Sequence, residues 1–368
     1  MSFKKFLLIT LLLLVTSLTT RAQELIVGGE FATRFDNREY SGNTYDVSQT
    51  LFSARLTPYL GVEWQKKHRM VVGVELMQHF GQNQGEREAF LSDVKPVMYY
   101  QFRTQKVHAA AGIFTRDQLQ GDYGHAIFGD STTFYHSRLS GFMGRYISQQ
   151  HKDTYVEAAI DWEGMQGVDT REKFRIMSAG RYTLDKGLYF GYGFSMLHFA
   201  GALNNKNVTD NMILNAHVGW KFHTKWSYDI KARFIVAPQR ARTAKPGWTN
   251  PCGAEIDFSI SRWGLKLENE LYIGDNLQPY LDIVSNPTTG ETFRQEGLYA
   301  GERFYSTADN IYNRTWIGYG QLLCNKSIAI DAGILFHYDG TGLGTSQQVK
   351  VSIFLERLFK IGGRAPRK

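Results

Sequence analysis

The sequence predicts an all-β protein, an antiparallel transmembrane β-barrel of about sixteen strands with short periplasmic turns and long external loops. Three observations predict this fold. Apolar and polar residues alternate with a two-residue period in successive segments, short and long connections alternate between those segments, and aromatic residues make up 14% of the chain. Because successive side chains of a strand point to opposite faces, the alternation gives each strand one apolar and one polar face.

The clearest alternation lies in the hairpin predicted for residues 253–274, which turns at Gly264. Its polar face carries Glu255, Asp257, Ser259, Ser261, Lys266, Glu268 and Glu270. Its apolar face carries Ile256, Phe258, Ile260, Leu265, Leu267, Leu271 and Ile273. Each arm is close to the roughly 9–11 residues that span a bilayer as a tilted strand. One face of the hairpin therefore needs an apolar medium while the other needs water.

The start of the chain has the features of a signal peptide. Lys4 and Lys5 precede an apolar run over residues 6–18, and Ala22 ends an acceptable cleavage site. The run is too short for a membrane helix, which needs about 20 apolar residues. We therefore expect export and cleavage near Ala22. The expected organisation is a signal peptide over 1–22, a transmembrane β-barrel over 23–359 and a basic C-terminal tail over 360–368.

The composition fits a membrane barrel without requiring one. Apolar residues make up 43% of the chain, yet the mean hydropathy is −0.33. A membrane barrel has this mixture because only alternate residues face lipid, although a secreted β-sandwich can have it too. The formal net charge of +7 is too small and too scattered for a nucleic-acid reader. The two cysteines, Cys252 and Cys324, are expected at opposite ends of strands, too far apart for a disulfide.

Strand-like segments follow one another along the chain with almost no helical period between them. The predicted strands are 24–35, 49–64, 68–80, 92–104, 106–116, 132–149, 153–163, 172–183, 187–200, 211–223, 225–237, 253–263, 264–274, 308–323, 327–338 and 347–359. The longer polar loops are 36–48, 81–91, 117–131, 164–171, 201–210, 238–252, 275–307 and 339–346. Short turns on one rim and long loops on the other are typical of outer-membrane barrels. A soluble sandwich has no reason to keep this order.

Several aromatic residues fall near strand ends, where they suit the two aromatic girdles of a membrane barrel. They include Trp64, Trp162, Trp226 and Trp263. With the export signal, the strand number and the order of the loops, the mature chain resembles bacterial outer-membrane β-barrel proteins of porin size, without matching a specific subfamily. The resemblance implies a place in the outer membrane of a Gram-negative envelope. The chain departs from these barrels in the basic tail after Phe359 and in the sequence of the loop 117–131.

The resemblance implies a porin-like channel for passive diffusion of small hydrophilic solutes, with charged inward side chains setting its selectivity. The candidate pore-lining residues are Arg55, Arg69, Arg103, Asp117, Asp122, Asp130, Arg138, Arg175, Arg181, Glu255, Asp257, Glu268 and Glu270. We expect basic residues mostly from the first half of the chain to face acids of the second half. The alternative is a closed barrel that serves as a structural or assembly subunit of a larger envelope complex.

A barrel lipid hydrolase is the less favoured alternative, and we predict that the protein is not an enzyme. A nucleophile paired with a positioned histidine is the usual requirement, but the chain has no Gly-x-Ser-x-Gly motif and its histidines are dispersed. No metal-binding motif is present, so we expect neither a metal nor another cofactor. The expected partners are outer-membrane lipid and small hydrophilic solutes, with no nucleic acid. A homo-oligomer, an envelope lipoprotein partner and the role of the loop 275–307 are left open.

Overall fold

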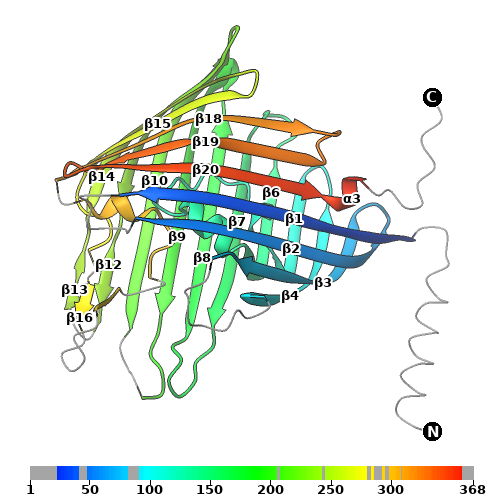
Figure 1. Cartoon of the computed structure of the whole chain (residues 1–368), viewed down its shortest axis with the longest axis horizontal. Coiled ribbons are helices and arrows are strands. Elements are labelled where there is room, and N and C mark those ends of the chain that lie inside the picture. Colours follow the sequence, from blue (N-terminus) through cyan, green and yellow to red (C-terminus); the bar gives the residue numbers. More distant parts are fainter. Residues whose placement is uncertain are drawn as a thin grey trace.

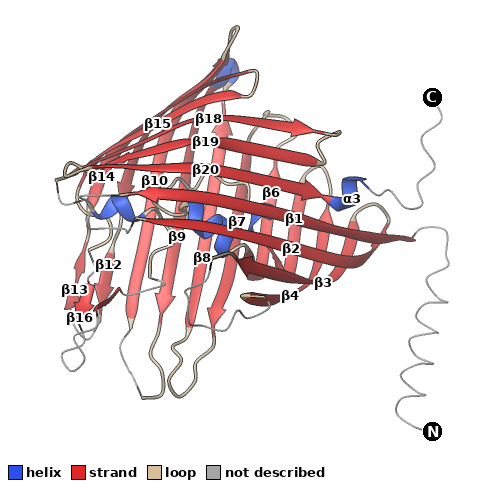
Figure 2. Ribbon diagram, viewed as in Figure 1, coloured by secondary structure: helices blue, strands red, loops and turns tan. Residues whose placement is uncertain are grey.

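The computed structural model describes most of the chain, and the account below concerns those residues. They are residues 23–40, 48–81, 91–204, 208–242, 245–279, 283–285, 292–294, 298–307 and 309–358. The predicted signal peptide, Phe359 and the basic tail lie outside the described residues. Strands dominate the described part, and the helical segments within it are short (Figure 2).

The strands are β1 (Gln23–Glu39), β2 (Gln49–Trp64), β3 (His68–His79), β4 (Asp93–Arg103), β5 (Val107–Thr115), β6 (Arg138–Ile147), β7 (Tyr155–Gly164), β8 (Lys173–Thr183), β9 (Leu188–Phe199), β10 (Thr209–His223), β11 (Ser227–Val236), β12 (Gln239–Ala241), β13 (Lys245–Thr249), β14 (Cys252–Arg262), β15 (Leu265–Gly274), β16 (Ile283–Ser285), β17 (Thr292–Arg294), β18 (Ile311–Leu323), β19 (Ile328–Tyr338) and β20 (Leu343–Phe354). The helical segments are η1 (Arg116–Gln118), α2 (Asp130–Tyr135), η2 (Asp185–Gly187), η3 (Arg303–Ser306) and α3 (Leu355–Leu358).

Sixteen long strands of the described chain form one closed antiparallel barrel. Each long strand pairs with the next long strand in the chain, and β1 pairs with β20 to close the ring (Figure 1). The short strands β12 and β13 form a hairpin beside the end of β10, and β16 and β17 form a separate two-stranded sheet. The predicted fold class is therefore confirmed. No helix among the described residues is long and apolar enough to span a membrane.

The two faces of the strands are those that the alternation predicts. In β14 the side chain of Ile256 is 56% exposed on the outside, whereas its neighbour Glu255 is 2% exposed and faces the lumen. Large apolar residues are exposed along the outer faces of many other strands, including Leu60, Val72 and Phe142. These residues form an apolar outer belt. Soluble monomers rarely expose contiguous apolar surfaces of this size, whereas membrane barrels carry such a belt against the hydrocarbon of the bilayer.

The tight turns lie at one end of the barrel, as predicted. Between β14 and β15 the chain reverses over Trp263 and Gly264, whose φ angles are 54° and 88°. A two-residue hairpin turn of type I′ needs positive φ at both central positions, and its backbone twist matches the twist of the flanking strands. The two cysteines lie at opposite ends of strands and are free, as expected.

Several predicted strand boundaries are wrong. The first strand, predicted over 24–35, runs from Gln23 to Glu39. The strand predicted over 132–149 begins at Arg138, because residues 130–135 form α2. The adjacent threonines and aromatic residues of α2 favour a strand by intrinsic propensity, but packing inside the barrel overrides that preference. The last strand, predicted over 347–359, runs from Leu343 to Phe354 and is followed by α3.

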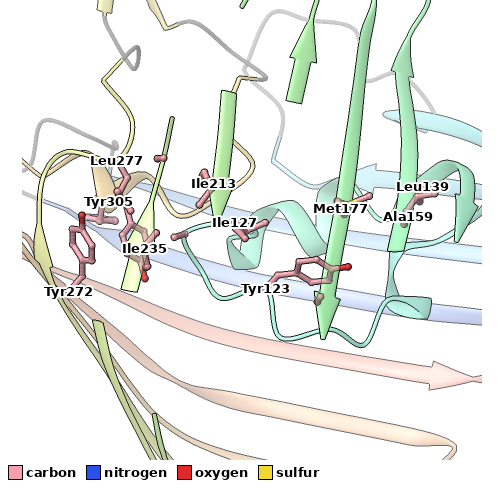
Figure 3. Close-up of a cluster of buried hydrophobic side chains, with 14 of the residues drawn as sticks. Tyr123, Ile127, Leu139, Ala159, Met177, Ile213, Ile235, Tyr272, Leu277 and Tyr305 are labelled. Carbon is pink, nitrogen blue, oxygen red and sulfur yellow. The ribbon is translucent and has the colours of Figure 1, made fainter. Parts of the chain in front are cut away.

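The interior contains a packed apolar cluster (Figure 3). Tyr123 and Ile127 come from the connection between β5 and β6, and Leu277 and Tyr305 come from the connection between β15 and β18. They pack against small or apolar inward residues of the wall such as Met177. Two long connections therefore enter the barrel and fill part of its lumen.

The outward orientation of β14 predicts how the barrel responds to a new charge. Ile256→Lys places a cation near the middle of the lipid-facing side and should lower the free energy of unfolding by about 2–4 kcal/mol. Ser259→Lys on the inner face of the same strand should have little effect, because it lies opposite Glu268. Urea titration in detergent measures both variants, and equal stabilities would contradict the orientation.

Candidate functional site

The connection between β5 and β6, residues 116–137, crosses the lumen and is called here the lumen loop. It contains η1 and α2. Its polar contacts reach β1, β2, β3, β7, β8, β11, β15 and β18, so it touches opposite sides of the ring. A chain segment that is bonded to so many strands divides the interior of the barrel.

Asp122 joins the lumen loop to a group of cations on the wall. Its carboxylate lies 3.1 Å from the guanidinium of Arg181 on β8, 2.8 Å from the ammonium of Lys231 and 2.7 Å from the guanidinium of Arg233, both on β11. Burial opposes the ionised form, but Arg233 and Lys231 hold the pKa of Asp122 well below its usual range. Asp122 is therefore ionised at neutral pH, and each of its contacts is charge-assisted.

His125 joins the loop to the opposite acids. Its Nδ1 lies 2.8 Å from Glu270 on β15, and its Nε2 lies 3.6 Å from Asp130 of the same loop. Burial and the nearby Arg314 lower the pKa of His125, but Glu270 and Asp130 outweigh both and raise it to about 10. His125 is therefore a cation at neutral pH. Asp130 in turn accepts a 2.6 Å hydrogen bond from Arg314 on β18.

Glu157 on β7 holds the backbone of the lumen loop. Its buried carboxylate accepts hydrogen bonds from the amides of Gln120 and Gly121, at 3.0 and 2.9 Å, and from the hydroxyl of Tyr123 at 3.0 Å. Arg145 on β6 lies 3.1 Å away and balances its charge. Each of these contacts satisfies a donor that would otherwise be buried without a partner.

The far end of the lumen loop is held on β2 and β3. Glu75 accepts hydrogen bonds from the hydroxyl of Ser137, at 2.8 and 2.7 Å, and from Arg138 at 2.7 Å. Arg55 donates to the carbonyl of Phe134 at 3.0 Å and lies over the ring of that residue. Both ends of the loop are therefore fixed to the wall by buried ions.

A second connection packs on the lumen loop. In one of its described parts, residues 298–307, the amide of Glu302 donates to the carbonyl of His125, and the carbonyl of Ala300 accepts from the amide of Gly129, both at 2.8 Å. The hydroxyl of Tyr305 donates to Glu255 on the wall. This part of the loop 275–307, whose role the sequence leaves open, thus lies in the lumen. Asp282, Glu291 and Glu296 of that loop lie outside the described residues.

Two polar cavities remain on either side of the lumen loop. The larger, of about 780 Å³, lies toward the long loops and is called the external cavity. The smaller, of about 420 Å³, lies toward the short turns and is called the periplasmic cavity. Arg116 and Phe128 line both, and the guanidinium of Arg116 lies 5.3 Å from the centre of the Phe128 ring. These two side chains therefore border both cavities.

The structure places most of the predicted pore-lining residues around these cavities, and most are ion-paired. The periplasmic cavity is lined by Asp117, Asp122, Asp257, Glu268 and Glu270. The external cavity is lined by Asp130, Arg138 and Arg175. Arg55, Arg181 and Glu255 are inward ions bound to the loops or to neighbouring strands. Two residues are not part of this group: Arg69 pairs with Glu356 of α3, and Arg103 is exposed at the end of β4.

Some of the contacts were not foreseen from the sequence. The Oγ of Ser53 lies 2.8 Å from Nδ1 of His79, across β2 and β3 near the external rim. The hairpin could have indicated this pair, because the tight turn at 65–67 sets Ser53 opposite His79. For His125 and Arg314, by contrast, no local sequence signal indicates a shared partner. Among the described residues, no group of three His, Cys, Asp or Glu side chains is arranged to hold a metal.

The closed ring, the apolar outer belt and the loop across a polar lumen define the class: an outer-membrane β-barrel of porin size. Solved structures of this class share the fold. The outer-membrane protein OpdK of Pseudomonas aeruginosa superposes with a TM-score of 0.52 at 9% identity, covering 90% of this chain and 99% of its own. OmpT of Vibrio cholerae also gives 0.52 at 9% identity, covering 92% and 99%. A BenF-like porin from Pseudomonas fluorescens gives 0.50 at 9%, covering 90% and 98%.

The sequence itself identifies the family. Residues 18–339 match the family described as lipid A 3'-O-deacylase-type, and the chain belongs to that family. No curated protein matches the chain. The prediction that the protein is not an enzyme is wrong, because this family is of an enzyme type. The prediction failed because it relied on a short sequence motif, whereas residues that act together in a barrel come from separate strands.

Asp122 and its three cationic partners on the wall are called here the Asp122 clamp, and this group predicts a stability effect. Asp122→Ala removes the carboxylate shared by Arg181, Lys231 and Arg233, and should lower the free energy of unfolding by about 3 kcal/mol, because cations are left partly buried with fewer partners. Asp117→Ala is the matched control, since Asp117 is an exposed acid of the same loop. Urea titration of both variants in detergent checks this, and equal losses would contradict the clamp.

The raised pKa of His125 predicts a pH dependence. A pKa raised from 6.5 to about 10 stabilises the folded state fully below pH 6.5, and the contribution is lost as the pH rises through 10. The free energy of unfolding of the wild type should therefore exceed that of His125→Gln at acidic and neutral pH. The difference should shrink steadily toward pH 10. Urea titrations of both proteins across this range measure it, and a constant difference would show that His125 does not titrate in this way.

Proposed function

We propose that the protein is a porin-like outer-membrane channel for passive diffusion of small hydrophilic solutes. One observation carries the proposal: the two polar cavities lie on opposite sides of the lumen loop and share Arg116 and Phe128 in their linings. Water and small solutes need a polar route through the barrel, and these cavities supply polar space on both sides of the lumen loop. The ion-paired lumen loop narrows the route and sets an upper limit on solute size.

The predicted pore-lining residues take specific roles under this proposal. Asp122 and Asp130 hold the lumen loop across the route, while Asp117, Glu268 and Arg175 line the adjoining cavities. Solutes would meet charges of both signs, which favours hydrated molecules over apolar ones of similar size. A channel of this kind would hold continuous water in its lumen, whereas the lumen of a closed structural barrel would be filled.

Single-channel recording on purified protein in a planar bilayer tests the channel. The wild type should give open steps of the order of a nanosiemens, as expected of a loop-narrowed water-filled pore. Asp122→Ala should give larger or noisier steps, because the lumen loop loses the Asp122 clamp. Lys106→Ala, on an exposed short turn outside both cavities, should match the wild type. A silent bilayer containing protein that still shifts in gel mobility on boiling would reject the proposal.

A second function, removal of an acyl chain from lipid A, is favoured by the family match together with the Ser53–His79 pair. A histidine nitrogen 2.8 Å from a serine hydroxyl can take its proton as the serine attacks an ester carbonyl. Ser53 is buried and the ring of Tyr135 lies 5.8 Å from that of His79, so an ester could reach the pair only if this part of the lumen loop moved. The described residues place no carboxylate in hydrogen-bond contact with His79.

Mass spectrometry of lipid A incubated with the protein in mixed micelles tests this second function. We expect loss of the mass of one acyl chain, and Ser53→Ala and His79→Ala should each slow the reaction by about a thousandfold if the pair is the catalytic one. His223→Ala is the matched control, because His223 also contacts a serine hydroxyl but lies at the exposed end of β10. Full activity in both Ser53→Ala and His79→Ala would exclude this pair, and no turnover by the wild type would exclude the reaction.

A further inference from the structure

An arginine lies between two tryptophan rings at the short-turn rim of the barrel. Arg262 is the last residue of β14, and Trp263 begins the tight turn that follows it. The guanidinium carbon of Arg262 lies 3.6 Å from the centre of the Trp263 ring and 5.6 Å from the centre of the Trp226 ring. The two tryptophan rings lie 6.3 Å apart. These three side chains are called here the arginine–tryptophan cluster.

The arginine–tryptophan cluster lies on the outside of the barrel. Arg262 and the exposed Ile256 are separated by an even number of residues in β14, so both side chains point outward. The side chain of Trp263 is 73% exposed, and Trp226 lies on the same side because its ring contacts both partners. Barrels of this class turn their short connections toward the periplasm. The cluster therefore lies where the apolar outer belt meets the periplasmic leaflet.

More aromatic rings continue this rim on the neighbouring strands. The ring of Trp220 on β10 lies 4.6 Å from that of Phe222, which stacks on Tyr228 of β11 at 4.8 Å. Tyr319 of β18 pairs with Leu265, the first residue of β15, and is 40% exposed. Tryptophan and tyrosine are enriched at the level of the lipid headgroups, because their rings combine an apolar body with a polar edge. These rings place the cluster at the depth of the lipid phosphates.

Arg262 has no carboxylate partner within the described part of the chain. Its contacts there are with the two rings, and neither an ion pair nor a hydrogen bond joins its guanidinium to another described residue. Arg240 gives the contrast, because it lies 4.4 Å from the centre of the Trp248 ring but also pairs with Asp210 at 2.7 Å. A guanidinium presents its N–H donors in a planar fork that fits the oxygens of a phosphate. The two rings hold the fork of Arg262 in place without using its donors.

We propose that the arginine–tryptophan cluster binds the headgroup of a phospholipid in the periplasmic leaflet, with the Arg262 guanidinium donating to the phosphate oxygens. A cation at the edge of a bilayer is stabilised when it reaches the phosphates, and the tryptophan rings pack on the apolar part of the same lipid. Hydrogen bonds between two charged groups are about twice as strong as neutral ones. The bound lipid holds the β14–β15 hairpin at a fixed depth. The site depends on neither function proposed above.

Three variants separate the phosphate contact from the apolar surface around it. Arg262→Gln removes both the charge and the fork, whereas Arg262→Lys keeps the charge alone. Arg103→Gln is the matched control, because Arg103 lies at the same rim but shares the inner side of β4 with Gln101, which bonds to Gln118 of the lumen loop. A shift in gel mobility on boiling establishes that each protein is folded. If Arg262→Gln does not fold, Arg262→Lys carries the test.

Native mass spectrometry measures the site directly. Phosphatidylglycerol is titrated into the protein in a non-ionic detergent, and the population with one bound lipid gives the dissociation constant. The wild type and Arg103→Gln should bind with the same affinity, because both keep the cluster. Arg262→Gln should bind about tenfold more weakly, and Arg262→Lys should fall between them. Equal affinity in the wild type and in both Arg262 variants would overturn the proposal.

Two further measurements decide whether a lipid is the occupant. An excess of inorganic phosphate should leave phosphatidylglycerol bound, since the rings hold the lipid by its apolar part. Displacement of the lipid by inorganic phosphate would instead show a site for free anions and would reject the lipid. The wild type without added lipid should be monomeric at this face. A dimer that Arg262→Gln separates would show that a second copy of the chain covers the cluster in place of lipid.

Discussion

The pairing of the first strand with the last is the constraint on which the rest of the structure depends. Residues 30–39 of β1 pair with residues 345–354 of β20, so no edge of the ring is left open. Hydrocarbon offers no partner for a free amide or carbonyl, so only a closed ladder is stable there. Closing sixteen strands produces a ring too wide for the inward side chains of the wall alone to fill. The content of the lumen must therefore come from the loops.

The lumen loop solves this problem and creates a second one. By entering the barrel it covers ionised wall groups such as Arg233 and Glu157, which would otherwise be solvated. A buried ion without a partner costs several kcal/mol, so the loop has to bring opposite charges to the right places. Asp122, His125 and the amides near Gly121 meet this requirement. The resulting ion pairs fix the position of the lumen loop more than they stabilise the fold, because the attraction between the paired charges mainly offsets the cost of removing them from water.

The sequence was informative wherever the cause of a structure is local. The strand over 49–64 was predicted with the observed boundaries, because lipid on one side and a polar interior on the other impose alternation on each residue. The same alternation placed Glu157 on the inner face. The path of the lumen loop could not be predicted, since Asp122 meets partners 59 and 111 residues away in the chain. The contact between Ser53 and His79 is an intermediate case. It is not local in sequence, but a tight turn between two predicted strands determines their register and so places the two residues opposite each other.

Membership of an enzyme-type family and a porin-like layout do not exclude one another, because a fold does not determine function and the likeness to porins at 9% identity concerns the fold alone. The two functions place different demands on the same loop. The proposed conduction would depend on the region around Phe128, which borders both cavities, whereas the proposed ester hydrolysis would depend on access past Tyr135, near the other end of the loop. A movement confined to α2 would uncover His79 and enlarge the external cavity while leaving Asp122 bound to β8 and β11. Under either proposal, the lumen loop and not the barrel wall would control access.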